Sequence, residues 1–210
     1  MSSDSNRGGG RLDRKVDGYR KMARELGYRS RAAFKLLQLN KRYGLLKRGD
    51  VVVDLGAAPG GWLQVARRKV GEEGFVLGVD ILPIRPLPYE NVLTLVADIR
   101  EEQTVSLILQ SLPRKADVVL SDASPQISGV WEVDHFSSVE LCRCVLRICE
   151  RVLRAGGNAL IKIFQGEEFD SFFSEFSKKF DFVKVSKPEA SRRRSAEIYL
   201  VGKGYNLWQT

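Results

Sequence analysis

The sequence predicts an α/β fold of the Rossmann-like type, with a seven-stranded, mostly parallel sheet and a terminal antiparallel strand. Three observations lead to this prediction. Short apolar runs alternate with helical patterns from residue 51 onward, which is typical of strands covered on both faces. A glycine-rich turn at 54–62 follows the first run. The last two runs, 181–186 and 196–202, have no helical pattern between them, so these strands must pair antiparallel.

Two helical patterns precede the sheet, at 13–26 and 30–43. The second begins at Ser30, a candidate N-cap, and ends against Gly44, a candidate C-cap. Its apolar spacing places Lys35 towards the edge of the core-facing side. Strands are then expected near 51–55, 74–79, 92–97, 116–121, 157–164, 181–186 and 196–202, and helices near 61–70, 101–112, 134–154 and 167–180.

The chain length of 210 residues fits one domain with a sizeable core. Residues 1–12 are polar, glycine-rich and basic, and we expect a disordered arm there. The single domain is expected at 13–204, including the N-terminal helices at 13–43, with a short tail at 205–210. No apolar run reaches the ~18 residues of a membrane span, and the first residues do not resemble a secretory signal.

The cysteine and histidine content argues against a metal site. The three cysteines (Cys142, Cys144 and Cys149) lie in one expected helix, at a spacing unlike that of zinc ligands. We expect them to be reduced and buried, which favours a cytoplasmic protein. His135 is the only histidine and is expected near a helix start, so we predict no metal.

The net charge of +8 is unevenly distributed, because lysine and arginine cluster at 7–47 and at 178–194. Such clusters favour an anionic partner, most often nucleic acid, although they also serve solubility. We expect a monomer.

The glycine-rich turn at 54–62 predicts a cofactor pocket, because ligands of doubly wound sheets bind beyond the carboxyl ends of the strands. Its spacing, G-x-x-x-G-G, differs from the pyrophosphate-binding G-x-G-x-x-G, and Pro59 lacks an N–H that an anion could use. S-adenosylmethionine therefore fits better than NAD. Asp80, 20 residues after Gly60, stands where a carboxylate can hold a ribose. The terminal antiparallel pair is likewise typical of methyltransferase folds.

Three charged residues occupy unusual positions in or after apolar strands. Asp122 follows the strand at 116–121, whereas Lys162 and Glu197 interrupt apolar runs. If the strand ends align, the three side chains converge beside the cofactor. The alternatives are a lysine at an exposed strand end and an outward-facing glutamate on an edge strand.

These residues suit methylation of a ribose 2′-hydroxyl, which must lose its proton as it attacks a methyl group. Lys162 could accept that proton, Asp122 and Glu197 could orient it, and Lys35 could supply a second positive charge. Enzymes that methylate bases use an [Asn/Asp]-Pro-Pro-aromatic turn or a cysteine beside a proline, and this chain has neither.

Five segments, at 30–36, 54–62, 121–129, 161–166 and 187–199, resemble the FtsJ/RrmJ family of RNA ribose 2′-O-methyltransferases, and the resemblance extends over about 15–202. It implies a catalytic tetrad of Lys35, Asp122, Lys162 and Glu197, with Lys162 as general base. It also implies cofactor contacts from Gly60, Trp62, Asp80, Asp98 and Asp122. One departure is Gln126, where the family pattern has asparagine.

The resemblance therefore implies S-adenosylmethionine-dependent 2′-O-methylation of a ribose, expected to be that of a uridine, in ribosomal RNA of the large subunit. A transfer RNA 2′-O-methyltransferase would share the same tetrad. Two other classes remain, a catalytically silent RNA-binding factor and an NAD-dependent oxidoreductase. The tetrad argues against the first, and the glycine spacing argues against the second.

Overall fold

The computed structural model describes residues 18–192 and 195–206. The arm expected at 1–12 lies outside the described residues, as do the start of the helix expected at 13–26 and most of the tail expected at 205–210. None of the described helices is both long and apolar enough to cross a lipid bilayer.

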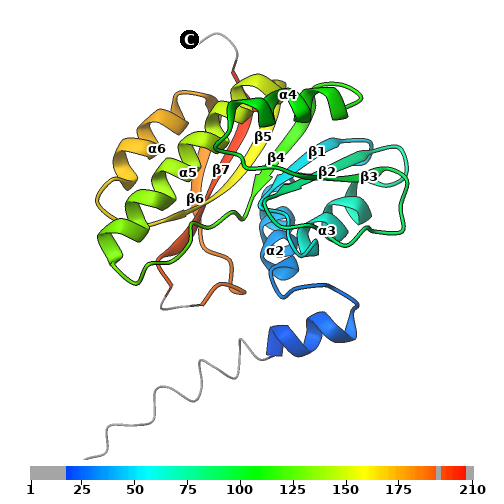
Figure 1. Cartoon of the computed structure of the whole chain (residues 1–210), viewed down its shortest axis with the longest axis horizontal. Helices are drawn as coiled ribbons and strands as arrows, with labels where there is room; N and C mark the ends of the chain where they lie inside the picture. The colour runs from blue at the N-terminus through cyan, green and yellow to red at the C-terminus, as the bar shows by residue number, and fades with distance from the viewer. Residues whose placement is uncertain (1–17, 193–194, 207–210) are drawn as a thin grey trace, which may run out of the picture.

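Seven strands form one sheet in the order β3-β2-β1-β4-β5-β7-β6 (Figure 1). The strands are β1 (Val51–Leu55), β2 (Phe75–Asp80), β3 (Val92–Val96), β4 (Ala116–Ser121), β5 (Leu153–Phe164), β6 (Phe180–Ser186) and β7 (Glu197–Tyr205). Neighbours among β1 to β5 are parallel, whereas β7 is antiparallel to both β5 and β6. These pairings confirm the predicted seven-stranded, mostly parallel sheet.

The strand order places the candidate cofactor turn at a switch point. The chain runs from β1 outward through β2 and β3, and then returns to β4 on the other side of β1. Ligands of doubly wound sheets bind at such a reversal, beyond the carboxyl ends of the strands. We call the edge at which β1 to β5 end the carboxyl edge. Because β7 lies between β5 and β6, the alternative that placed Glu197 on an edge strand is wrong.

Helices cover both faces of the sheet. They are α2 (Ala33–Tyr43), α3 (Gly61–Val70), α4 (Glu102–Ser111), α5 (Trp131–Val152) and α6 (Phe169–Ser177). Figure 1 shows α4, α5 and α6 on one face, with α2 and α3 on the other. The strand residues alternate accordingly, since Val53 and Leu55 pack with α5 while Val52 packs with α2 and α3.

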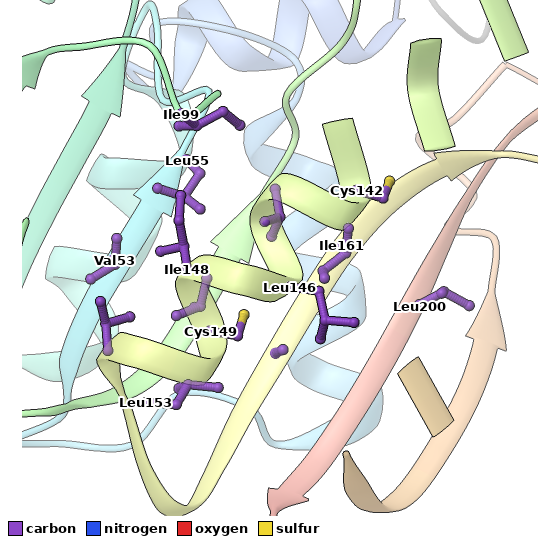
Figure 2. Close-up of a cluster of buried hydrophobic side chains, with 14 of the residues drawn as sticks. Val53, Leu55, Ile99, Cys142, Leu146, Ile148, Cys149, Leu153, Ile161 and Leu200 are labelled. Atoms are coloured by element: carbon purple, nitrogen blue, oxygen red, sulfur yellow. The ribbon is translucent and has the colours of Figure 1, made fainter. Parts of the chain in front are cut away.

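The long helix α5 carries much of the core on its face of the sheet. Figure 2 shows Leu146, Ile148 and Cys149 of α5 beside Ile161 of β5, and all four are buried. The cysteines are free and buried, as predicted, and burial raises the pKa of the Cys142 and Cys149 thiols. These two thiols therefore serve packing, because the un-ionised thiol is a poor nucleophile.

The start of α2 differs from the prediction. The helix begins at Ala33, and Ser30 provides no side-chain cap. A single tight turn precedes it, and the Ser30 hydroxyl lies only 2.3 Å from where a Cβ on Gly61 would stand. Ser30 is therefore used for close packing of α2 against α3. The predicted C-cap is confirmed, because Gly44 has φ 60° and its N–H donates to Asn40.

The start of α5 also differs, because the helix begins at Trp131, three residues before the expected start. The Asp134 carboxylate accepts hydrogen bonds from the Ser128 and Gly129 N–H groups, at 2.7 and 3.2 Å, which fastens the preceding loop to the new first turn. His135 consequently lies in the second turn, where it is buried and accepts the Glu168 N–H through Nε2 at 2.9 Å.

At the opposite edge of the sheet, Asp117 joins β4 to its neighbours. Its carboxylate accepts the Val51 N–H at 2.7 Å and pairs with the guanidinium groups of Arg114 and Arg154. Burial alone would raise the pKa of Asp117, but these three partners lower it below the usual value. The ionised carboxylate is thus the form that the folded protein prefers.

We predict that Asp117→Asn lowers the free energy of unfolding at neutral pH by about 1–2 kcal/mol, because a charged acceptor of three hydrogen bonds is lost. A folded-state pKa below the unfolded value of ~3.9 gives stability that is present above that value and lost as pH falls through the folded one. Urea unfolding at neutral pH and at about pH 3 should therefore show the difference shrinking in acid. An equal difference at both pH values would contradict this assignment.

Candidate active site

Asp122 lies at the centre of a cluster of charged side chains at the carboxyl edge. It follows β4 directly, and its Oδ1 lies 3.4 Å from Lys162 Nζ of β5 and 3.7 Å from Lys35 Nζ of α2. Lys162 Nζ also donates a hydrogen bond of 2.7 Å to the main-chain oxygen of Asp122. The two lysines thus approach one carboxylate from different elements.

Glu197, at the start of β7, completes the cluster. Its Oε1 lies 2.8 Å from Lys35 Nζ and accepts a hydrogen bond of 2.7 Å from the Ser191 hydroxyl. The Lys35 and Lys162 side chains are only 8% and 7% exposed, so the alternative of a lysine at an exposed strand end is wrong. The sequence-based expectation that the strand ends align is confirmed as geometry.

The register between β5 and β7 explains why these side chains share one face. Lys162 pairs with Tyr199, and Phe164 pairs with Glu197. Tyr199 packs in the cluster that faces α2 and α3, so Lys162 and Glu197 point to that same face. Lys35 meets them from α2, where it is buried rather than at the edge of the core-facing side as predicted. Opposite charges make this burial tolerable.

The pKa of Glu197 is consistent with an ionised partner for both lysines. Burial raises the pKa of this carboxyl, but Lys35, Lys162 and the Ser191 hydroxyl outweigh burial and hold it below the usual value. Glu197 is therefore an anion at neutral pH and can hold Lys35 in place.

Tyr199 is a member of the site that the sequence reasoning missed. Its hydroxyl donates a hydrogen bond of 2.7 Å to Asp122 Oδ1, and its ring lies 5.7 Å from Lys35 Nζ and 6.0 Å from the Trp62 ring. Burial, together with Asp122 and Glu197, raises the pKa of Tyr199 well above the usual value, so the hydroxyl remains a donor. Its position two residues after Glu197, on the same strand face, was the available signal.

The glycine-rich turn passes directly against the loop that carries Asp122. Gly56 has φ 76°, and a Cβ there would lie 2.5 Å from the Cα of Ala123. Gly60 has φ 104°, and a Cβ there would meet the Arg29 guanidinium at 2.9 Å. Glycine is therefore required at both positions, because side chains are rarely tolerated at such φ values and would clash here. The candidate cofactor turn therefore lies directly beside the loop that carries Asp122 of the tetrad.

Carboxylates at the ends of two neighbouring strands, β2 and β3, lie along the cofactor side of the carboxyl edge. Asp80 ends β2 and accepts the Ala58 N–H at 2.8 Å and the Leu82 N–H at 2.9 Å, which links it to the turn. Asp98 follows β3 and pairs with Arg100, which lowers the pKa of Asp98. Both therefore lie on the β2–β3 side of the turn, away from the tetrad.

Trp62 lies deeper than a residue that lines an open pocket. It is 3% exposed, and its indole N–H donates a hydrogen bond of 2.8 Å to the main-chain oxygen of Ala32. Trp62 thus connects α3 to the residue before α2, and it backs Tyr199 of the tetrad cluster.

Asp54, at the carboxyl end of β1, is a second residue that the sequence reasoning did not single out. It is fully buried, and neither carboxylate oxygen has a hydrogen-bond partner among the described residues. Burial, with Asp122 and Asp80 nearby, raises the pKa of Asp54 well above the usual value. A buried carboxylate without a partner is costly and would be relieved by a cation or a hydrogen-bond donor from a ligand.

Comparisons with known proteins agree with this geometry. Residues 28–205 match the model of the FtsJ-like methyltransferase family. A protein of Methanothermobacter thermautotrophicus is 49% identical over 94% of this chain and 95% of its own length, and one of Methanococcus vannielii is 49% identical over 93% of this chain and 75% of its own. Both are named ribosomal RNA large subunit methyltransferase E.

Among solved structures, a Plasmodium falciparum protein described as a ribosomal RNA methyltransferase is similar, with a TM-score of 0.74 and 30% identity. The match covers 85% of this chain and 98% of that one. The fibrillarin pre-rRNA processing protein of Methanococcus jannaschii, at 16% identity and a TM-score of 0.55, shares the fold.

We predict that Asp54→Asn changes stability in a pH-dependent way in the ligand-free protein. A folded-state pKa above the unfolded value of ~3.9 means that Asp54 destabilises the protein increasingly as pH rises above that value. The variant should therefore gain stability relative to the parent chain as pH rises from about 4 towards neutrality, measured by thermal melting. S-adenosylmethionine should also raise the melting temperature of the variant by less than it raises that of the parent chain. A melting difference that is independent of pH would contradict the assignment.

Proposed function

Because the chain belongs to the FtsJ-like methyltransferase family, we propose that it transfers a methyl group from S-adenosylmethionine to a ribose 2′-hydroxyl of large-subunit ribosomal RNA, at a uridine. The observation that carries this proposal is the cluster of Lys35, Asp122, Lys162 and Glu197 beside the glycine-rich turn, in which both lysines are buried. The names of the archaeal relatives support ribosomal RNA as the acceptor.

The residues at the carboxyl edge fit S-adenosylmethionine, which supplies an electrophilic methyl group when bound. Asp54 is a buried carboxyl group without a hydrogen-bond partner among the described residues, which suits a cationic cofactor. Asp80 would hold the ribose hydroxyls and Asp98 the adenine amino group, while Gly60 allows close approach of the backbone. Trp62 would support the pocket from behind.

Lys162 is the proposed general base. A neutral amine has two N–H groups and one lone pair, and Lys162 Nζ faces two acceptors of Asp122, the main-chain oxygen and Oδ1. These acceptors can engage both N–H groups and leave the lone pair for the substrate hydroxyl. S-adenosylmethionine would supply the methyl group, and Lys162 would take the proton of the 2′-hydroxyl as its oxygen attacks that group.

The other members of the cluster keep this geometry. Asp122 joins the two lysines and Tyr199, while Glu197 holds Lys35. Such alignment can lower the barrier by roughly 7–11 kcal/mol. General base catalysis typically contributes 10²–10⁴-fold, which corresponds to roughly 3–5 kcal/mol. Positioning is therefore the larger of the two contributions, and it depends on the buried ion pairs.

Arginines beside the tetrad support RNA as the acceptor. Burial, and then the nearby charges of Arg192 and Arg20, lower the pKa of Arg31, which lies close enough to Glu197 to feel its charge. Arg31 is held there by a hydrogen bond of 3.1 Å to Ala190 O. Like charges gathered in this way favour an anion such as a backbone phosphate. Arg193 and Arg194, which belong to the basic cluster at 178–194, lie outside the described residues.

We predict that the protein transfers labelled methyl groups to ribosomal RNA, presented naked or as large subunits, and that Lys162→Ala lowers the turnover rate by at least about 10²-fold. Lys162→Arg should not restore activity, because a guanidinium does not lose its proton at neutral pH. The parent chain and both variants should bind S-adenosylmethionine alike by calorimetry.

Lys69→Ala, an exposed lysine in the last turn of α3 and outside both basic clusters, is the matched control and should keep full turnover. Near-normal turnover of Lys162→Ala would disprove the proposed base. Label that appears only in transfer RNA would disprove ribosomal RNA as the acceptor.

We also predict that Arg31→Ala weakens RNA binding and reduces the dependence of log Kd on log salt concentration by about one unit, since about one phosphate contact is lost. Arg151→Ala, near the end of α5 at the opposite edge of the sheet, should leave the salt dependence unchanged. Filter binding across a salt series measures both. Identical slopes for the two variants would show that Arg31 contacts no phosphate.

A further inference from the structure

A run of exposed apolar side chains follows the loop that begins at Asp122. Most of the large apolar side chains that the structure describes are buried. Within ten positions here, however, five are 46–58% exposed: Ile127, Val130, Trp131, Val133 and Phe136. Several exposed apolar side chains within one short segment favour a binding role for that segment.

Trp131 is the member of this segment that stacks on two other rings. Its indole lies 6.0 Å from the His135 ring at an interplanar angle of 20°, and 6.3 Å from the Phe164 ring at 23°. His135 is 4% exposed and is held by the Glu168 N–H, so it forms a rigid base. Trp131 itself remains 46% exposed. The indole is therefore held in place by its neighbours and yet accessible.

The stacked rings begin at the tetrad. Phe164 is the direct cross-strand neighbour of Glu197 and lies two residues after Lys162 on the same strand. Directly opposed residues of an antiparallel pair have adjacent side chains on one face. The rings of Phe164 and Trp131 thus lead outward from Glu197 towards the exposed surface of the loop that carries Asp122.

An RNA nucleobase is the occupant that this surface fits. For a ribose hydroxyl to reach the buried tetrad, its nucleotide must leave the regular stack, which exposes a face of the neighbouring base. Single-stranded bases are recognised by stacking on aromatic side chains. The arginines near Glu197 can hold the adjoining phosphates. A protein partner would use the apolar residues but would not require the orientation of the indole.

We propose that Trp131 is a stacking platform for the base next to the methylated nucleotide, an inference that rests on the proposed RNA substrate. The test measures binding rather than methyl transfer, so that it does not depend on the reaction. The probes are a fluorescein-labelled short oligouridylate and an abasic oligoribonucleotide of the same length, titrated with the full chain and followed by anisotropy.

We predict that Trp131→Ala weakens oligouridylate binding about tenfold, equivalent to about 1.4 kcal/mol, and leaves binding of the abasic oligomer unchanged. Trp131→Phe should keep most of the affinity, because a smaller ring still stacks. Phe182→Ala, which removes a ring of similar exposure from the edge strand β6, should change neither probe. Thermal melting of each variant confirms that it is folded.

Two results would overturn the proposal. If Trp131→Ala weakened binding of both probes equally, or weakened binding of neither probe, no base would stack on Trp131. Unchanged oligouridylate binding together with weaker binding to intact large subunits, in both Trp131→Ala and Phe136→Ala, would identify the surface as a protein contact. Normal stacking without any methyl transfer to RNA would instead refute the proposed function alone.

Discussion

The site depends on one partly buried carboxylate, that of Asp122. It receives Lys162 from β5, Lys35 from α2 and the Tyr199 hydroxyl from β7, and Glu197 holds Lys35 from its other side. Burial of two lysine side chains beside each other would be costly without carboxylates next to them. The same carboxylate that makes their burial possible also holds elements from distant parts of the chain in one geometry.

Buried carboxylates at the two edges of the sheet differ in whether they have hydrogen-bond partners. At the amino ends of the strands, Asp117 is fully paired, with the Val51 N–H and two guanidinium groups as partners. At the carboxyl ends, Asp54 of the neighbouring strand is buried with no partner among the described residues. The paired carboxylate stabilises the fold, whereas the unpaired one reserves binding capacity for a ligand. This division is typical of a scaffold that keeps its stability and its function at separate edges.

The number of strands and the antiparallel pairing of the last two could be predicted from the sequence. Short apolar runs mark the strands, and no helical pattern separates the last two runs. The sequence was also sufficient for the convergence of Lys162 and Glu197, since polar residues at the ends of neighbouring strands must meet. The burial of Lys35 was not predictable, because helical spacing reports the apolar face and not a carboxylate supplied from far along the chain. The start of α5 was not predicted either, because it depends on a contact outside the helical pattern. The Asp134 carboxylate in its first turn accepts a hydrogen bond from Ser128, in a loop without helical periodicity.

We propose that this cluster acts on a ribose hydroxyl and not on a base. The most direct measurement is mass spectrometry of the nucleosides released from large subunits that have been incubated with the protein and isotopically labelled S-adenosylmethionine. We expect one labelled nucleoside whose additional methyl group fragments with the ribose, at a linkage that resists alkaline hydrolysis. A label that fragments with the base would contradict this proposal.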